Sequence, residues 1–325
     1  MALALKGLLD KRKVALARAR FHAWWEGDAF DEAAAQAAID AAANDKPQPA
    51  PERSTEDELF DALPFDMPPR LTALAAIWSE GRVRPGDDAS EKLEPARLGI
   101  APEGVLAVLS PGLEAPLVAL AGAHAGKIEA YEWRDETFAA LKHGLAKAKL
   151  DERIGLARID LEAHVFPHAF YDGLISIDDF AYCGHPPFLA LQIIKTLKPG
   201  AAAVVECYVG LKCAEFPTAF ASAFSEPQIR AHGDLLQAFS DAGLVLESDE
   251  DLTEEFLGLA RGGFKRLGDV LTNNAKLDVA AMRELAWEAE AWRMRMKLLA
   301  QRRLERRRFI LRRPAEGSPE PRPQA

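Results

Sequence analysis

The chain has 325 residues, of which 49% are hydrophobic and 28% are charged, and its formal net charge is -10. This length and apolar content allow one large domain with a substantial core and an additional segment. The acidic balance argues against a general affinity for nucleic acid. No run of about 18 apolar residues occurs, and the apolar run at the amino terminus is too short for a signal peptide. We therefore expect a cytoplasmic protein without a membrane span.

The cysteines carry no sign of a special site. Cys183, Cys207 and Cys213 have neither the spacing of metal ligands nor an even number for disulfide pairing. Free thiols in a reducing compartment are the expected state, and no metal site is predicted.

The amino-terminal part is expected to be separate from the rest. Residues 1–45 have apolar side chains at helical spacing and predict a helical segment that contains the pair Trp24-Trp25. Residues 46–56 are rich in proline and predict a linker. The tryptophan pair has two interpretations, which are docking of a protein partner and packing within its own segment.

The main domain is expected to span residues 57–313, with a disordered tail at 314–325. It begins with a predicted amphipathic helix at 71–78 and a turn at 82–86. From Gly104 onward, short apolar runs alternate with helical segments. Strands are expected at 104–109, 127–133, 154–159, 171–177 and 201–209, and helices after residue 112 and at 136–148 and 187–197. This alternation predicts an α/β fold with a parallel sheet covered on both faces.

Three residues at the ends of the predicted strands suggest a ligand. Gly112 follows the first strand, Glu132 ends the second and Asp160 ends the third. Parallel sheets bind ligands beyond the carboxyl ends of their strands, where the topology switches direction. A carboxylate after the second strand can accept the hydroxyl protons of a ribose, and a glycine lets the backbone approach a ligand closely. Together these residues indicate a nucleoside-containing cofactor, although acidic residues also end strands simply to contact water.

Four motifs resemble the class I S-adenosylmethionine-dependent methyltransferases, over roughly residues 70–313. They are Glu132-Trp133-Arg134-Asp135-Glu136, Asp160-Leu161-Glu162 with Val165-Phe166-Pro167, Phe170-Tyr171-Asp172, and Leu197-Lys198-Pro199-Gly200. The resemblance implies a Rossmann-like methyltransferase fold, with a mostly parallel twisted sheet and helices on both faces. It also implies S-adenosylmethionine as the cofactor. It places that cofactor at Ser110, Gly112, Glu114, Glu132, Trp133, Asp160, Leu161 and Ser176.

The loop after the first strand departs from the family. When Ser110, Gly112 and Glu114 are aligned with the family's three glycines, only Gly112 is retained, and Val108 replaces an acid. Pro111 removes one N–H donor, and Glu114 adds bulk and negative charge. Two outcomes are open at this point. The cofactor is bound weakly or not at all, or the loop has been rebuilt around Glu114.

The segment after the fourth strand holds the candidate catalytic residues. By the resemblance, residues 178–187 face the transferred methyl group. Methyl transfer is an in-line displacement, so a base is needed only if the acceptor keeps a proton. His185 is the best suited group near neutral pH, followed by Asp178, Asp179 and Tyr182. The alternative is that all four are solvated loop residues.

The carboxyl-terminal part predicts more of the same fold. A helix is expected up to residue 239, a strand near 244–246, a helix at 254–267 that resembles the roof of the family's acceptor pocket, a helix at 278–304, and a strand at 309–311 on the sheet edge. The many arginines between 293 and 313 are either a site for an anionic partner or a solvated face that offsets nearby acids. The second interpretation is favoured.

Three functions follow from these patterns. The first is methyl transfer from S-adenosylmethionine to an unidentified small-molecule acceptor. The second is a catalytically inactive protein of the same fold that serves as a binding or regulatory module, through its amino-terminal helices or its basic end. Nucleic-acid modification is the weakest, since only the arginines support it. The intact later motifs favour the enzyme, and the altered glycine loop favours the module.

Overall fold

The computed structural model describes residues 33–34, 36–37, 65–210, 229–272, 277–315 and 317. The chain divides into two compact units, Met1–Pro64 and Phe65–Ala325. In the first unit, residues 33–34 and 36–37 are helical. The tryptophan pair, the linker at 46–56, Cys213 and most of the tail lie outside the described residues, so the predictions made for them stay predictions.

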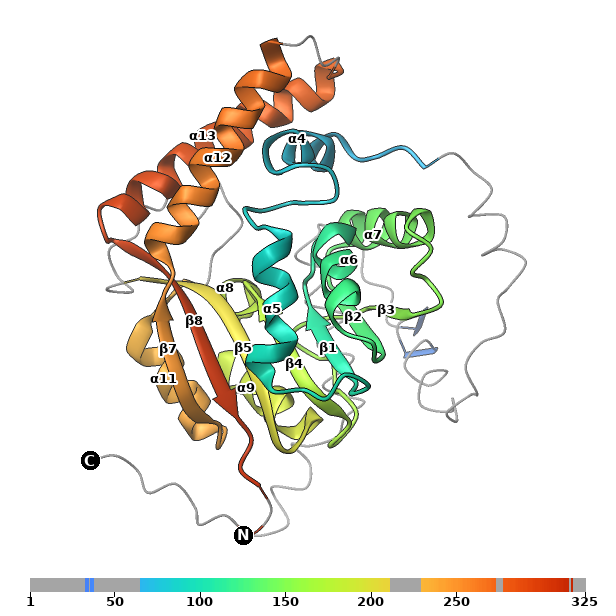
Figure 1. Cartoon of the computed structure of the whole chain (residues 1–325), viewed down its shortest axis with the longest axis vertical. Helices are drawn as coiled ribbons and strands as arrows, with labels where there is room; N and C mark the ends of the chain where they lie inside the picture. Colours follow the sequence, from blue (N-terminus) through green and yellow to red (C-terminus); the bar gives the residue numbers. More distant parts are fainter. Residues whose placement is uncertain are drawn as a thin grey trace. The chain divides into compact units, whose positions relative to one another are not determined.

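The second unit is built on an eight-stranded sheet with the order β3-β2-β1-β4-β5-β8-β7, and β6 pairs with β5. The strands from β1 to β5 pair in parallel as predicted, while β8 runs antiparallel to β5 and β7 (Figure 1). The strands are β1 (Leu106–Leu109), β2 (Ile128–Glu132), β3 (Ile154–Arg158), β4 (Tyr171–Ile177), β5 (Leu197–Gly210), β6 (Arg230–Ala231), β7 (Val245–Asp251) and β8 (Leu304–Arg312).

The topology switches direction at β1. β2 and β3 follow on one side of this strand, and β4 and β5 lie on the other. In the register of the sheet, Leu109 is opposite Tyr131 of β2 and Ser176 of β4. The carboxyl ends of the three strands therefore lie side by side. We call the segments that follow them, residues 110–113, 132–134 and 177–182, the rim.

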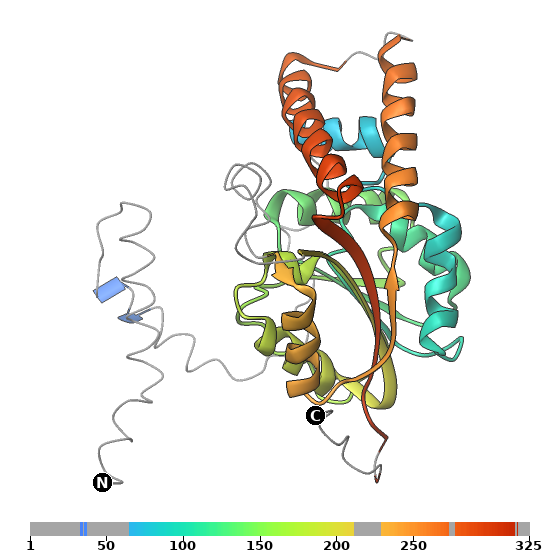
Figure 2. The same cartoon turned by 90° about the vertical axis from the view of Figure 1, so that its left-hand side faces the viewer.

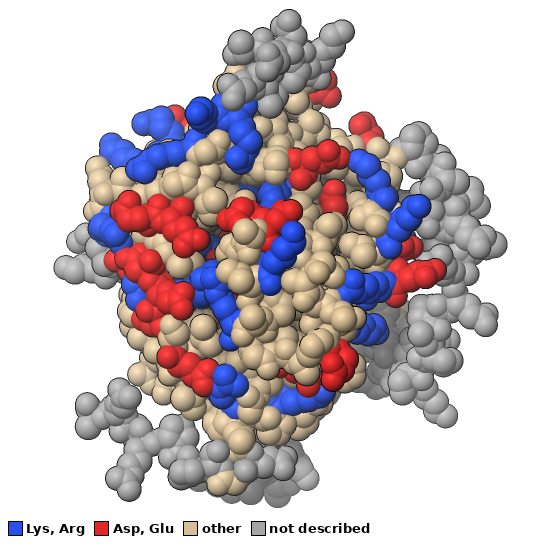
Figure 3. Space-filling model, viewed as in Figure 1, with Lys and Arg blue, Asp and Glu red and all other residues tan. Residues whose placement is uncertain are grey.

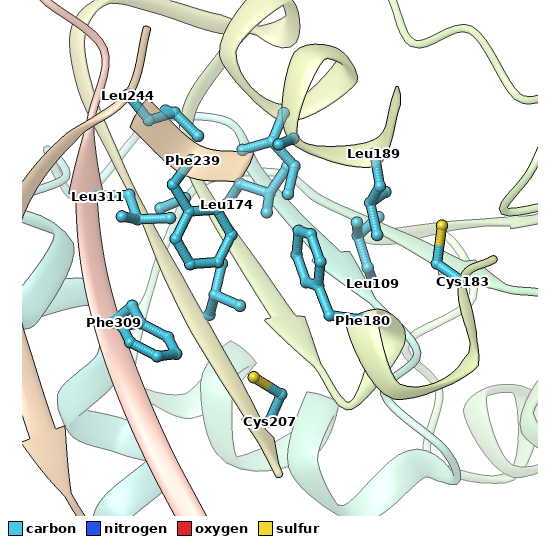
Figure 4. Packing of buried hydrophobic residues seen from close by; sticks show 14 of the residues in the cluster. Leu109, Leu174, Phe180, Cys183, Leu189, Cys207, Phe239, Leu244, Phe309 and Leu311 are labelled. Atoms are coloured by element: carbon cyan, nitrogen blue, oxygen red, sulfur yellow. The ribbon is translucent and has the colours of Figure 1, made fainter. Parts of the chain in front are cut away.

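Helices cover both faces of the sheet, as Figure 2 shows from the side. On one face lie α5 (Asp88–Leu98), α6 (Glu114–Ala123) and α7 (Asp135–Lys147), and on the other lie α9 (Pro186–Thr196) and α11 (His232–Asp241). Successive strand residues point to opposite faces of the sheet. Val108 therefore packs on the face covered by α5, α6 and α7, and Leu109 packs on the face covered by α9 and α11. Figure 4 shows the cluster that contains Leu109, in which Phe180 packs edge-on against Phe239 of α11 and Phe239 in turn contacts Phe309 of β8, with 5.2 and 5.4 Å between the ring centroids.

A third layer covers the carboxyl ends of the parallel strands. It consists of α4 (Pro69–Trp78), α12 (Thr253–Thr272) and α13 (Val279–Ala300) (Figure 1). Trp78 of α4 packs edge-on against Trp292 of α13, with 4.5 Å between ring centroids. The same cluster includes Leu113 of the rim and Tyr208 of β5. These helices therefore form the ceiling of the rim. Among the described residues, no helix is long and apolar enough to span a membrane.

Besides the short elements β6 and α8 (Asp179–Tyr182), which were not predicted, the structure differs from the sequence predictions at α5 and β8. Helix α5 was not predicted, because Pro95 and several charges interrupt its apolar pattern. Its ends are nevertheless typical, since Asp87 accepts a hydrogen bond from Ser90 N at 2.9 Å and Gly99 ends the helix in the left-handed region. The prediction that residues 309–311 lie on the sheet edge was wrong. β8 lies between β5 and β7 and packs apolar side chains on both faces, as an interior strand does.

Candidate functional site

The rim borders a cavity of about 80 Å³. Ser110, Trp133, Asp178 and Tyr182 line it from the sheet side, and residues of α4 and α13 line it from the ceiling. These four lining residues are all among the predicted site residues. The structure therefore brings together parts of the loops after β1, β2 and β4, as the switch in topology requires.

Glu132 at the end of β2 is fully buried and already holds a cation. Its Oε1 accepts hydrogen bonds from Arg134 Nε at 2.8 Å and from the backbone N–H groups of Trp133 and Arg134, both at 3.1 Å. Its Oε2 accepts from Arg134 Nη2 at 2.9 Å. Burial alone would lower the pKa of Arg134, but the Glu132 charge outweighs it and raises that pKa. The carboxylate that a ribose would need is thus engaged by Arg134.

A second arginine lies on the loop after β1. Arg84 Nη1 donates to Ser110 O at 2.9 Å, and Nη2 donates to Pro111 O at 3.1 Å. Gly112 has φ 82°, and a Cβ built on it would lie 2.5 Å from Val83 Cγ2. The turn at 82–86 therefore covers this loop closely, and the carbonyl oxygens of Ser110 and Pro111 already accept from a guanidinium group.

The serines of the predicted site bind a buried acid. Ser110 Oγ donates to Asp179 Oδ1, and Ser176 Oγ donates to Asp179 Oδ2 at 2.6 Å. Burial raises the pKa of Asp179 to about 6, against the opposing effect of the two serine hydrogen bonds. Asp179 is thus a buried residue of the rim, and it joins the ends of β1 and β4.

Two aromatic rings of the rim contact each other. The ring centroids of Trp133 and Tyr182 are 5.1 Å apart, at an interplanar angle of 48°. A flat ring inserted between them needs about 7 Å, since stacked carbon atoms approach to about 3.5 Å on each side. The gap is therefore closed. Trp133 Nε1 is buried and has no hydrogen-bond partner among the described residues.

The remaining predicted site residues do not line this cavity. Asp160 is exposed and its Oδ1 accepts from Glu162 N at 2.8 Å, while Leu161 packs in the core. Glu114 begins α6 and turns its carboxylate toward Gly144 of α7. His185 is exposed at the start of α9. Glu132 and Asp160 therefore differ in environment, one sealed by its partner and the other in water.

A buried network of ion pairs extends from the rim into the sheet. Asp178 pairs with Arg306 of β8, which also contacts Glu206 of β5 at 3.2 Å. Glu206 in turn holds Arg308 at 2.7 Å, and Arg308 lies 3.4 Å from Glu94 of α5. This network reaches the helix layer from the rim through Arg306 and Arg308, which are both buried.

The prediction of a solvated arginine face is wrong for three arginines. Arg295, Arg306 and Arg308 are at most 4% exposed. For Arg306 and Arg308 the reason is the interior position of β8, which turns them toward acids on neighbouring elements. The spacing of two between these arginines in a strand was the signal for a shared face. Arg295 lies on α13, where its guanidinium group packs on the rings of Trp292 and Tyr208. Elsewhere, charges of both signs are interspersed on the surface, as Figure 3 shows for one side.

The described cysteines are not part of the rim cavity. Cys183 and Cys207 are buried free thiols, and burial raises the pKa of both. Among the described residues, no group of His, Cys, Asp or Glu could hold a metal ion.

The rim residues do not fit S-adenosylmethionine in this arrangement. Arg134 engages the carboxylate after β2, Arg84 engages the loop carbonyl oxygens, and the Trp133–Tyr182 contact fills the gap between the rings. The carboxylate of Glu132 and the carbonyl oxygens of Ser110 and Pro111 are thus engaged by side chains of the protein itself, while Asp160 stays exposed. Binding would require at least these groups to move.

Solved structures with this architecture are numerous. Phosphoethanolamine N-methyltransferase 2 of Haemonchus contortus, solved with S-adenosylhomocysteine or S-adenosyl-L-methionine, aligns with a TM-score of 0.64 and 18% identity over 74% of this chain. The chain spans 56% of the length of that protein. The [4+2]-cyclase SpnF aligns with a TM-score of 0.62 and 15% identity. The alignment covers 79% of this chain and 94% of SpnF. A putative sarcosine dimethylglycine methyltransferase of Galdieria sulphuraria aligns with a TM-score of 0.61 and 12% identity. The alignment covers 75% of this chain and 98% of that protein.

No protein-family model and no curated protein matches the sequence. The likeness to the solved structures therefore lies in the fold. It covers the sheet and helix arrangement that the sequence motifs predicted.

Proposed function

We propose that this chain, which has the fold of the class I S-adenosylmethionine-dependent methyltransferases, is a catalytically inactive member of that fold that serves as a binding or regulatory module. The observation that carries the proposal is the pair of Glu132 and Arg134. A buried carboxylate with a bidentate guanidinium partner is not available to a ribose.

Two further contacts support the same conclusion. Arg84 donates to the carbonyl oxygens of Ser110 and Pro111, in the loop that the resemblance assigns to the cofactor. Tyr182 contacts Trp133, which closes the space between these two predicted site residues. Opening the rim would leave a buried charge unpaired, which costs about 3–5 kcal/mol in typical proteins. This cost weakens the binding of any ligand that requires the rim to open.

The neighbours do not decide between activity and its loss. Several are named as methyltransferases, and one is named as a [4+2]-cyclase. One fold hosts different chemistries, so function must be argued from the site. The partner of such a module remains a proposal as well, since the amino-terminal helices expected to bind it lie outside the described residues.

Methyl transfer to a small-molecule acceptor, with S-adenosylmethionine as cofactor, is the second candidate. It is favoured by Asp178 and Tyr182, which line the same cavity as Ser110 and Trp133. In an opened rim, Glu132 would hold the ribose and Asp178 or Tyr182 would face the acceptor. His185 would have to move toward the cavity to act as a base.

Calorimetric titration with S-adenosylmethionine and adenosine tests the proposal. We expect no saturable heat from adenosine at millimolar concentration, and no transfer of labelled methyl groups from S-adenosylmethionine to a panel of small acceptors. Micromolar affinity for S-adenosylmethionine that is lost in Glu132→Gln, with the fold intact by circular dichroism, would overturn the proposal and restore the enzyme.

A further inference from the structure

A second cavity, of about 70 Å³, is bordered by α5, α12 and the face of the sheet that α5 covers. Ile175 of β4 and Val204 of β5 line it from the sheet, and Phe256 and Leu259 line it from α12. These side chains give the cavity an apolar wall. None of the four predicted site residues at the rim cavity belongs to this lining, so the second cavity is a separate space.

Glu94 of α5, which is 6% exposed, lines the same cavity. Two arginines approach its carboxylate, and both reach the same oxygen. Arg97 donates to Oε1, and Arg308 Nη2 lies 3.4 Å from Oε1. The other oxygen, Oε2, is buried and has no hydrogen-bond partner among the described residues. A buried acceptor without a donor costs free energy, so a ligand that donates to Oε2 stabilises it.

The charges around the cavity are predominantly acidic. Its lining contains five carboxylates and three arginines, which are Asp87, Glu91, Glu94, Glu206 and Glu255 against Arg84, Arg306 and Arg308. The ion-pair partners of these groups from outside the lining do not reverse the balance. They add the carboxylates Asp88, Asp178 and Glu250 and the arginines Arg82 and Arg97. The cavity therefore suits a cation better than an anion.

The environment of Glu94 has the same imbalance. Burial and the neighbouring Glu206 raise the pKa of Glu94, against the opposing effect of Arg308 and Arg97. The two arginines therefore compensate only part of the cost of ionising this carboxyl group. A further cation at Oε2 would favour the ionised form.

We propose that this cavity binds a small primary amine, an ammonium group on a short aliphatic chain. An ammonium group presents three N–H donors, one of which would form a charge-assisted hydrogen bond to Glu94 Oε2. The chain would pack on the apolar wall.

The size of the cavity limits the occupant. A volume of about 70 Å³ exceeds the roughly 10–15 Å³ that one water needs and is below the roughly 150 Å³ of a cavity that holds benzene. The part of the ligand inside the cavity therefore has only a few carbon atoms. Glu255, which is exposed, belongs to the lining and marks where the cavity meets solvent. Any larger remainder of the ligand would leave the cavity there.

Thermal unfolding and calorimetry with propylammonium chloride test the inference. The amine is expected to raise the midpoint Tm saturably, with a dissociation constant on the order of 1 mM. Propan-1-ol, which matches the amine in size without the charge, and potassium chloride at equal ionic strength are expected to have no such effect. An equal response to propylammonium and propan-1-ol, or to propylammonium and potassium chloride, would overturn the inference.

Two variants of α5 provide the matched control. Glu94→Gln keeps the shape of the side chain and removes its charge, and it is expected to weaken propylammonium binding at least tenfold. Asp88→Asn removes a charge from the same helix outside the lining, where the side chain is 65% exposed, and it is expected to leave binding unchanged.

A third variant keeps every charge. Leu259→Phe adds bulk to the apolar wall and is expected to weaken propylammonium binding as well. Unchanged binding in both Glu94→Gln and Leu259→Phe would place the amine elsewhere and overturn the inference.

This inference goes beyond the proposed function, because it assigns a ligand to a site outside the rim cavity. Micromolar affinity for S-adenosylmethionine that is lost in Glu132→Gln would overturn only the inactive rim. A missing response to propylammonium would overturn only the amine site.

Discussion

Arg134 holds both carboxylate oxygens of Glu132, with Nε to Oε1 at 2.8 Å and Nη2 to Oε2 at 2.9 Å. The two residues are separated by one position, at the junction of β2 and α7. Because the partner is so close in sequence, the pair can form whenever this junction folds. The charge of Glu132, at the end of β2, is therefore neutralised by Arg134.

Removing Arg134 should be costly. In Arg134→Met the carboxylate of Glu132 stays buried without its cation, and we expect a loss of about 3–5 kcal/mol in the free energy of unfolding, measured by urea denaturation. The double variant Glu132→Gln/Arg134→Met should recover more than half of that loss, because no uncompensated charge remains. A loss below about 1 kcal/mol in the single variant would mean that the pair behaves as a surface ion pair.

Asp179 should make stability depend on pH. Its pKa is about 6 in the fold against an ordinary value of 3.8, so between these values the folded protein binds a proton that the unfolded chain has released. Stability from this group is thus present at low pH and is lost as pH rises through 6, by up to about 3 kcal/mol. In Asp179→Asn the unfolding free energy should fall less between pH 4 and 7. Parallel curves for the two proteins would contradict the shift.

An added side chain should destabilise the protein more at Gly112 than at Gly99. Both glycines lie in the left-handed region, with φ 82° and 64°, so alanine strains the backbone at either position. Only at Gly112 does the added Cβ meet a neighbour, Val83 Cγ2 at 2.5 Å, whereas nothing lies within 4 Å at Gly99. We expect Gly112→Ala to cost roughly 1–3 kcal/mol more than Gly99→Ala in urea unfolding. Adding Val83→Ala should reduce that difference, and its persistence would rule out the contact.

Two arginines near the start of β8 should differ sharply. Arg306→Met leaves Asp178 and Glu206 without their shared cation and should destabilise by about 3–5 kcal/mol. The side chain of Arg302 is 44% exposed and pairs with Asp251. Arg302→Met should therefore lower the free energy of unfolding by at most about 1 kcal/mol. Raising the salt concentration should abolish the second effect and leave most of the first. Similar costs for the two variants would contradict the buried network.

The order of strands was predictable because it depends on short apolar runs separated by helical segments. The runs at 104–109 and 171–177 gave β1 and β4 almost to the residue. The carboxyl ends of β1, β2 and β4 lie side by side, and Ser110, Trp133, Asp178 and Tyr182, which come at or after these ends, line one cavity.

The partners of the rim residues were not predictable from motifs. Arg84 reaches Ser110 across 26 positions and Arg306 reaches Asp178 across 128, so neither contact follows from local spacing. Arginine is usually exposed, and only the interior position of β8 explains why Arg306 and Arg308 are not. The local pair of Glu132 and Arg134 was visible in the sequence, but spacing alone did not reveal that the arginine folds back.

The insertion of β8 between β5 and β7 has a consequence for biosynthesis. β5 ends at Gly210, and its antiparallel partner begins only at Leu304. Until the ribosome has made residues 304–312, β5 presents an unpaired edge and β7 has no strand to join. Nascent or truncated chains that lack this segment should therefore be targets for chaperones and prone to aggregation, even though most of the sheet has already been synthesised.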